Sequence, residues 1–193
     1  MIREKKGEKK NKSLARDICY IAMFVAVMTV CSWMSVLVGS IPVTFQTLGV
    51  CLTAGILGWK RGTLAIGSYI ALGLCGAPVF AGFTGGFAKL AMPTGGYILG
   101  FLPTALIVGG VSDLIGKKFG KRKYAALSVA CLLGMLACYA VGVIWFMIYN
   151  MGADGTVNFF AAVLVCVVPY LPFDFAKIAV AVFLVSKLKK HIK

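Results

Sequence analysis

Two charged residues, Asp174 and Lys177, interrupt an apolar run near the end of the sequence, PYLPFDFAKIAVAVFLV (169–185). An ionised aspartate only accepts hydrogen bonds and suits ligand N–H groups, while a lysine only donates them and suits a carboxylate or carbonyl. Their spacing places both side chains on one side of a helix. Within a membrane each charge would cost roughly 2.5–3.5 kcal/mol. The pair therefore predicts a site for a small molecule with N–H donors and an anionic or strongly accepting group.

Two explanations without a ligand stay open for this pair. The side chains can form an internal ion pair, or Lys177 can extend its ammonium group toward the membrane surface. We favour the binding interpretation, because ionisable residues inside a membrane are functional candidates by default.

The elements that must position this pair are long apolar segments. The chain has 193 residues, of which 60% are hydrophobic and 13% charged. Soluble domains are roughly 45–50% apolar, and a spanning helix needs about 20 apolar residues. We therefore predict an all-α integral membrane protein, a six-transmembrane-helix bundle. The approximate limits of its spans are Ile18–Val38, Thr44–Trp59, Thr63–Leu74, Gly95–Val111, Ala125–Tyr149 and Pro172–Ser186.

Two features of this pattern are irregular. The second and third spans are short, and the apolar segment 157–170 is too short to be a span. We expect this segment to fold over the bundle or to enter it part-way.

Basic residues occur in four groups, which set the predicted orientation. Of the 20 Lys and Arg residues, seven lie in 1–16, two at 60–61, five in 117–123 and four after Ser186. Positive residues mark cytoplasmic segments, so both termini are predicted to be cytoplasmic. We attribute the net charge of +14 to anchors that meet anionic membrane lipid, and predict no nucleic-acid partner. The predicted division is a basic cytoplasmic segment, 1–16, and one six-helix substrate-binding domain, 17–193.

Helix-breaking residues gather on the predicted outer side, in segments 39–50, 73–97 and 150–174. Irregular backbone at membrane depth survives only where it is buried in protein or lines a cavity. We therefore predict an outward-opening, aromatic small-molecule pocket. Its predicted aromatic and polar groups are Phe45, Phe80, Phe83, Tyr97, Tyr170, Thr44, Gln46 and Thr94. For any one aromatic residue, a place in the interfacial belt is an equal alternative.

Four motifs follow one another along the chain: IPVTFQTLGV (41–50), GAPVFAGFTGG (76–86), PTGGYILGF (93–101) and PYLPFDFAKIAVA (169–181). Together they resemble the membrane-embedded substrate-binding (S) subunit of energy-coupling-factor biotin transporters, over nearly the whole chain after residue 17. The resemblance implies capture of biotin from outside a bacterial plasma membrane. It also implies two kinds of partner, a transmembrane coupling subunit and two cytoplasmic ATPase subunits.

The resemblance also implies functional residues. Asp174 and Lys177 match the family's ligand-binding pair, and segment 94–97 lies in its ligand-binding loop region. Biotin fits the chemistry of the pair, with Asp174 facing a ureido N–H and Lys177 facing the carboxylate or the ureido oxygen. Lys89 departs from the apolar residue expected in this loop, and either attracts an anionic vitamin at the pocket mouth or points to water. The predicted ligand-binding set is Gln46, Phe80, Gly86, Thr94, Tyr97, Asp174 and Lys177.

Small residues four apart, Ala22 and Ala26, lie in the first predicted span. Such spacing allows close approach between helices, and the resemblance implies that this pair contacts the coupling subunit. Without the resemblance, internal packing would explain this pair and the similar pair Gly96 and Gly100 equally well.

Motifs typical of nucleotide-binding proteins and enzymes are incomplete in this sequence. The nearest approach to a phosphate loop, GVSDLIGKK (110–118), has one residue too many between its glycines and a lysine where Ser or Thr is required. We predict no enzymatic activity, no metal site and no cofactor. The main alternative is a self-sufficient ion-coupled secondary transporter of a small anionic solute, with Asp174 and Lys177 as a proton-linked site. A third hypothesis is that the chain is a membrane enzyme that acts on a lipid.

Overall fold

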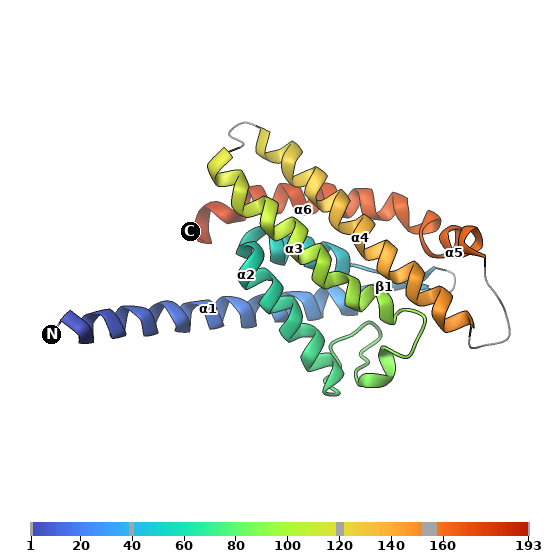
Figure 1. Ribbon diagram of the computed structural model, residues 1–193, viewed down its shortest axis with the longest axis horizontal. Coiled ribbons are helices and arrows are strands. Elements are labelled where there is room, and N and C mark those ends of the chain that lie inside the picture. Colours follow the sequence, from blue (N-terminus) through green and yellow to red (C-terminus); the bar gives the residue numbers. More distant parts are fainter. Residues whose placement is uncertain (1, 39–40, 119–121, 152–157, 193) are drawn as a thin grey trace.

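The computed structural model describes residues 2–38, 41–118, 122–151 and 158–192, and these are almost entirely helical (Figure 1). The helices are α1 (Ile2–Trp33), α2 (Gln46–Leu74), α3 (Gly95–Lys118), α4 (Lys123–Met151), α5 (Phe159–Cys166) and α6 (Leu171–Ile192). The described chain also contains two short 3-10 turns, η1 (Phe87–Lys89) and η3 (Val168–Tyr170), and two strands, β1 (Ser35–Val38) and β2 (Ile41–Thr44).

Four stretches of the described chain are long and apolar enough to cross a membrane: Ser13–Trp33, Gly95–Ile115, Lys123–Met151 and Phe159–Lys189. These lengths and compositions make the chain a multi-pass membrane protein.

The first predicted span is wrong at its end. The hydropathy pattern predicts a helix that continues to Val38, but α1 ends at Trp33 and the next residues form β1. This strand pairs antiparallel with β2, with Ser35 opposite Thr44. Hydropathy could not place this boundary, because SVLV is as apolar as the helix before it. Valine is also a common strand residue.

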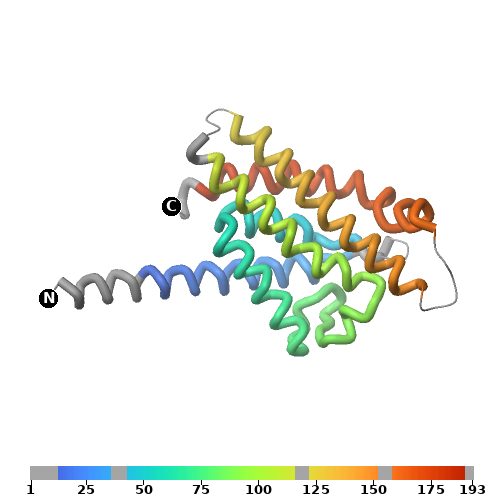
Figure 2. Tube along the Cα trace, in the orientation of Figure 1, coloured from blue at the N-terminus to red at the C-terminus, as the bar shows by residue number. Residues whose placement is uncertain are grey.

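The second and third predicted spans fall on the two arms of one helix, α2, which is broken at Gly58. This residue has φ of +78°, a conformation that glycine adopts without a steric penalty. A Cβ atom there would lie 2.3 Å from Oδ1 of Asp113 on α3. The other oxygen of that carboxylate accepts a hydrogen bond from the N–H of Trp59 at 3.0 Å, so α3 caps the second arm. The chain changes direction sharply at this break (Figure 2).

The last three predicted spans, Gly95–Val111, Ala125–Tyr149 and Pro172–Ser186, lie within α3, α4 and α6. α3 packs closely against α4, since a Cβ atom at Gly96 would lie only 2.3 Å from Cβ of Trp145. Internal packing, the alternative left open for the pair Gly96 and Gly100, is therefore present. The main apolar core is shared by α1, α2, α3, α4 and α6.

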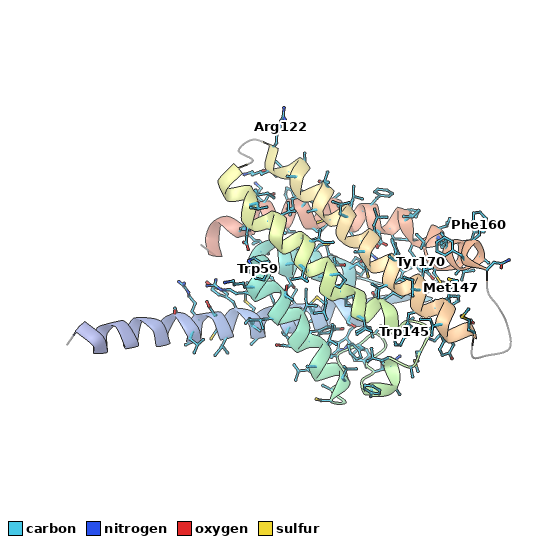
Figure 3. The ribbon with its side chains drawn as sticks, in the orientation of Figure 1. Trp59, Arg122, Trp145, Met147, Phe160 and Tyr170 are labelled. Atoms are coloured by element: carbon cyan, nitrogen blue, oxygen red, sulfur yellow. The ribbon has the colours of Figure 1, made fainter. Side chains whose placement is uncertain are left out.

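The apolar segment after α4 forms α5 and η3 in its described part, residues 158–170. Ala162, Cys166 and Tyr170 pack with Val143 of α4 in a second apolar cluster, as expected for a segment folded over the bundle. Figure 3 shows Tyr170 turned toward the bundle and Phe160 turned away from it.

The irregular segments share one end of the molecule. The hairpin β1–β2, the loop 75–94 and α5 lie at one end, while α6 ends at the opposite end, from which α1 enters the bundle (Figure 1). This arrangement brings the predicted breaker segments together around a common volume.

Candidate binding site

A cavity of about 800 Å³ lies among these segments. Its wall combines residues from β1, β2, α2, the loop 75–94, α3, α4, the α5–α6 junction and α6. The volume is within the roughly 300–1,000 Å³ typical of small-molecule sites. The aromatic residues of the wall are Phe80, Tyr97, Phe101, Tyr139 and Tyr170, and its hydroxyl and amide side chains are Ser35, Thr44, Gln46, Thr47, Thr84, Thr94, Tyr97, Tyr139 and Tyr170.

Asp174 and Lys177 both line this cavity, and both are buried, with 6% and 8% of their surface exposed. The ammonium group of Lys177 lies 2.8 Å from Oδ1 of Asp174. Asp174 is in the first turn of α6, where the helix dipole favours a negative charge. The predicted internal ion pair is therefore present, and it forms part of the cavity wall.

Two residues that sequence reasoning missed complete this polar cluster. Tyr139 of α4 donates a hydrogen bond to Oδ2 of Asp174. Thr47 of α2 donates to Oδ1 of Asp174 at 3.4 Å, and the ammonium group of Lys177 donates to the Thr47 hydroxyl at 3.4 Å. Their only signal in the sequence is a hydroxyl group inside an apolar helix.

The cluster is suited to exchange partners with a ligand. A buried ion pair adds little net stability, because desolvation of the charges offsets their attraction. The Thr47 contacts, at 3.4 Å, are long for hydrogen bonds and therefore weak. A ligand that supplies an N–H to Asp174 and an acceptor to Lys177 could replace them without leaving either charge unpaired.

Gln46 lines the cavity, but its polar atoms are held by the protein. Its amide nitrogen donates to the hydroxyl groups of Ser32 and Tyr69, at 2.8 Å each, and its oxygen accepts from Thr44 at 3.1 Å. Tyr69 in turn donates to the carbonyl of Val79 at 3.0 Å. The network joins α1, α2 and the loop 75–94, so Gln46 fixes the position of the wall.

Five other predicted residues also line the cavity: Thr44, Phe80, Thr94, Tyr97 and Tyr170. The Tyr97 hydroxyl donates to the carbonyl of Cys166 at 2.9 Å, and its ring meets Tyr139 edge-on at 6.4 Å. These contacts hold the Tyr97 ring in place at the wall.

Three residues named from the sequence do not line the cavity. Phe45 is 38% exposed, while Phe83 is 64% exposed and stacks on Trp33 with ring centroids 4.8 Å apart. Gly86 shapes the loop instead, with φ of +96° and its N–H donating to the carbonyl of Gly73 at 2.7 Å. Breaker residues indicated the correct end of the bundle but not the direction of each side chain.

The apolar helical bundle, with a buried acid–base pair in the wall of a cavity of small-molecule size, defines a multi-pass membrane protein with a candidate binding site. More specifically, the BioY family model matches residues 5–193, and the chain belongs to the BioY family. The expected resemblance is thereby confirmed.

Relatives and a solved structure extend this comparison. The chain is 37% identical to the biotin transporter BioY of Thermotoga maritima over 175 residues, which cover 91% of this chain and 96% of that protein. It is also 37% identical to the probable biotin transporter BioY of Pyrococcus horikoshii over 175 residues, which cover 91% and 97%. The crystal structure of the S-component for biotin from an ECF-type ABC transporter superposes with a TM-score of 0.81 at 25% identity, covering 93% of this chain and 94% of that one.

Proposed function

We propose that this chain captures biotin and mediates its uptake as the substrate-binding subunit of an ATP-driven energy-coupling-factor transporter in the cell membrane. The observation that carries this proposal is the Asp174–Lys177 pair, buried in the wall of a small-molecule cavity. The names of the relatives support the substrate, since they are biotin transporters. The solved structure supports the role, because it is an S-component.

Biotin's functional groups match the cluster. Its ureido ring offers N–H donors to the carboxylate of Asp174, and its ureido oxygen or carboxylate can accept from Lys177. Phe80, Thr94 and Tyr97 would contact the ligand from the wall, with Gln46 and Gly86 holding the wall in shape.

The proposed topology has six crossings and both termini in the cytoplasm. The two arms of α2 would add two short crossings to the four long spans. The four basic groups would then lie on the cytoplasmic side, and the cavity would face outward. The basic segment 1–16 would be the cytoplasmic part of α1, followed by a single domain.

Ala22 and Ala26 are proposed to contact the transmembrane coupling subunit. Both are exposed on α1, and only 11% of this span is buried within the chain, against 44% in each of the spans of α3 and α4. Two small residues four apart favour the close approach of another helix over coverage by lipid. Two ATPase subunits would bind on the cytoplasmic side and supply the energy, and no catalysis by this chain is expected.

Uptake of labelled biotin tests the proposal. Cells lacking biotin transport would express the chain with or without the coupling subunit and the two ATPases. We expect uptake that is lost when the ATPases are omitted and that persists when the proton gradient is dissipated at constant ATP. Uptake that survives without ATPases but collapses with the gradient would support the ion-coupled secondary transporter instead.

A further inference from the structure

A third charged residue, Lys89, lies in the wall of the same cavity. Among the described residues that line the cavity, Lys89, Asp174 and Lys177 are the only charged ones. Asp174 and Lys177 neutralise each other at 2.8 Å. The wall therefore carries one unbalanced positive charge, and that charge belongs to Lys89.

The backbone of Lys89 is held in a defined position. Lys89 ends the 3-10 turn η1, its N–H donates to the carbonyl of Gly86 at 3.1 Å, and its carbonyl accepts from Met92 at 3.4 Å. Gly86 is in turn bound to Gly73 near the end of α2. The loop therefore presents Lys89 from an element separate from α6.

The ammonium group of Lys89 is available to a ligand. Its side chain is partly buried, and within the described part of the chain it has neither an ion pair nor a hydrogen bond. A cation at a partly desolvated wall attracts an anion more strongly than it would in bulk water. A carboxylate that accepts a charge-assisted hydrogen bond there would neutralise the cavity.

We infer that Lys89 is a specificity-determining residue that binds the carboxylate of the ligand. Lys177 then donates to the ureido oxygen, and Asp174 accepts from a ureido N–H. This inference rests on the proposed function, and it divides recognition between the loop 75–94 and α6. The cavity then selects a monoanion and discriminates against a neutral ligand with the same ring.

Calorimetric titration of the purified full chain with biotin and with its neutral carboxamide tests the inference. We expect the parent to prefer biotin by at least about tenfold, as a charge-assisted hydrogen bond warrants. Lys89→Met should abolish this preference, because it should weaken the binding of biotin but not that of the carboxamide. Lys89→Arg should retain the preference. Lys187→Met, which changes an exposed lysine outside the cavity wall, should behave as the parent.

Each contrary result identifies which claim fails. If Lys89→Met keeps the parent's preference for biotin over the carboxamide, Lys89 does not bind the carboxylate. The proposal of biotin capture is unaffected by that result. If Lys89→Met weakens both ligands equally, the residue shapes the loop and the inference is wrong. If a folded parent binds neither compound, the proposed function falls and the inference falls with it.

Discussion

At the scale of single residues, the site depends on how Asp174 is held. Its two carboxylate oxygens accept from three side chains, Lys177, Thr47 and Tyr139, on three different helices. Three of the roughly four lone-pair sites of the carboxylate are thereby occupied, and the remaining one is held in a fixed direction. Tyr139 is thus a positioning residue for the proposed ureido contact.

Tyr139→Phe should weaken biotin binding by about fivefold, or about 1 kcal/mol, because it removes one hydrogen bond to a charged group while keeping the ring. Calorimetry on the purified chain measures the change. Tyr124→Phe, on an exposed tyrosine of the same helix, is the matched control. In an Asp174→Asn background the Tyr139 change should have little further effect, and additive losses would contradict a positioning role.

The sequence predicted the charged members of this cluster but not the uncharged ones. A charge in an apolar run is costly enough to stand out, and Asp174 and Lys177 were identified in this way. Burial of Thr47 and Tyr139 costs little free energy when their hydroxyl groups are hydrogen-bonded, so neither residue stands out in an apolar sequence. Phe45 and Phe83 show the reverse error, since aromatic residues near breakers suggest a pocket whether or not they face it.

At the scale of elements, the break in α2 is fixed by Gly58 and the carboxylate of Asp113. Gly58→Ala should destabilise the fold by roughly 1–3 kcal/mol, because alanine is strained at positive φ and its Cβ would meet that carboxylate. The thermal unfolding midpoint in detergent measures this loss. Gly67→Ala, in the same helix with open space around it, should be neutral or stabilising. Equal effects of the two substitutions would contradict the role given to the break.

A second prediction at this scale concerns the exposed face of α1. Ala26→Leu should leave biotin binding by the isolated chain unchanged, but should lower uptake with the complete transporter by at least about tenfold, because a larger side chain prevents close helix contact. Binding and uptake would be measured on the same variant. Ala140→Leu, at an exposed alanine of α4, should affect neither. Normal uptake by Ala26→Leu would exclude α1 as the contact.

The elements themselves were predicted unevenly, for a physical reason. The spans that became α3, α4 and α6 are long and apolar, so hydropathy located them. The hairpin β1–β2 was missed because its composition continues that of α1, and only pairing between two short segments defines it. The grouping of the breaker segments at one end of the bundle could be predicted from the charge pattern. That pattern indicates the side of the membrane on which a segment lies, but not its local conformation.

At the scale of the whole molecule, two functional features lie toward opposite ends of one bundle. The cavity lies among the irregular segments at one end. The parts of α1, α2 and α6 that carry the basic groups lie toward the other end (Figure 1). The first end would receive biotin and the second would meet the ATPases. The proposed biotin capture requires that the buried pair on α6 recognise the ligand.

Calorimetric titration of the purified parent, Asp174→Asn and Lys177→Met with biotin tests that requirement most directly. We predict saturable binding by the parent and a loss of at least about 2 kcal/mol, roughly thirtyfold, in each variant, since each leaves a buried polar partner unmatched. Thermal unfolding would establish that the variants are folded. Unchanged affinity in both folded variants, or no binding by a folded parent, would contradict the account.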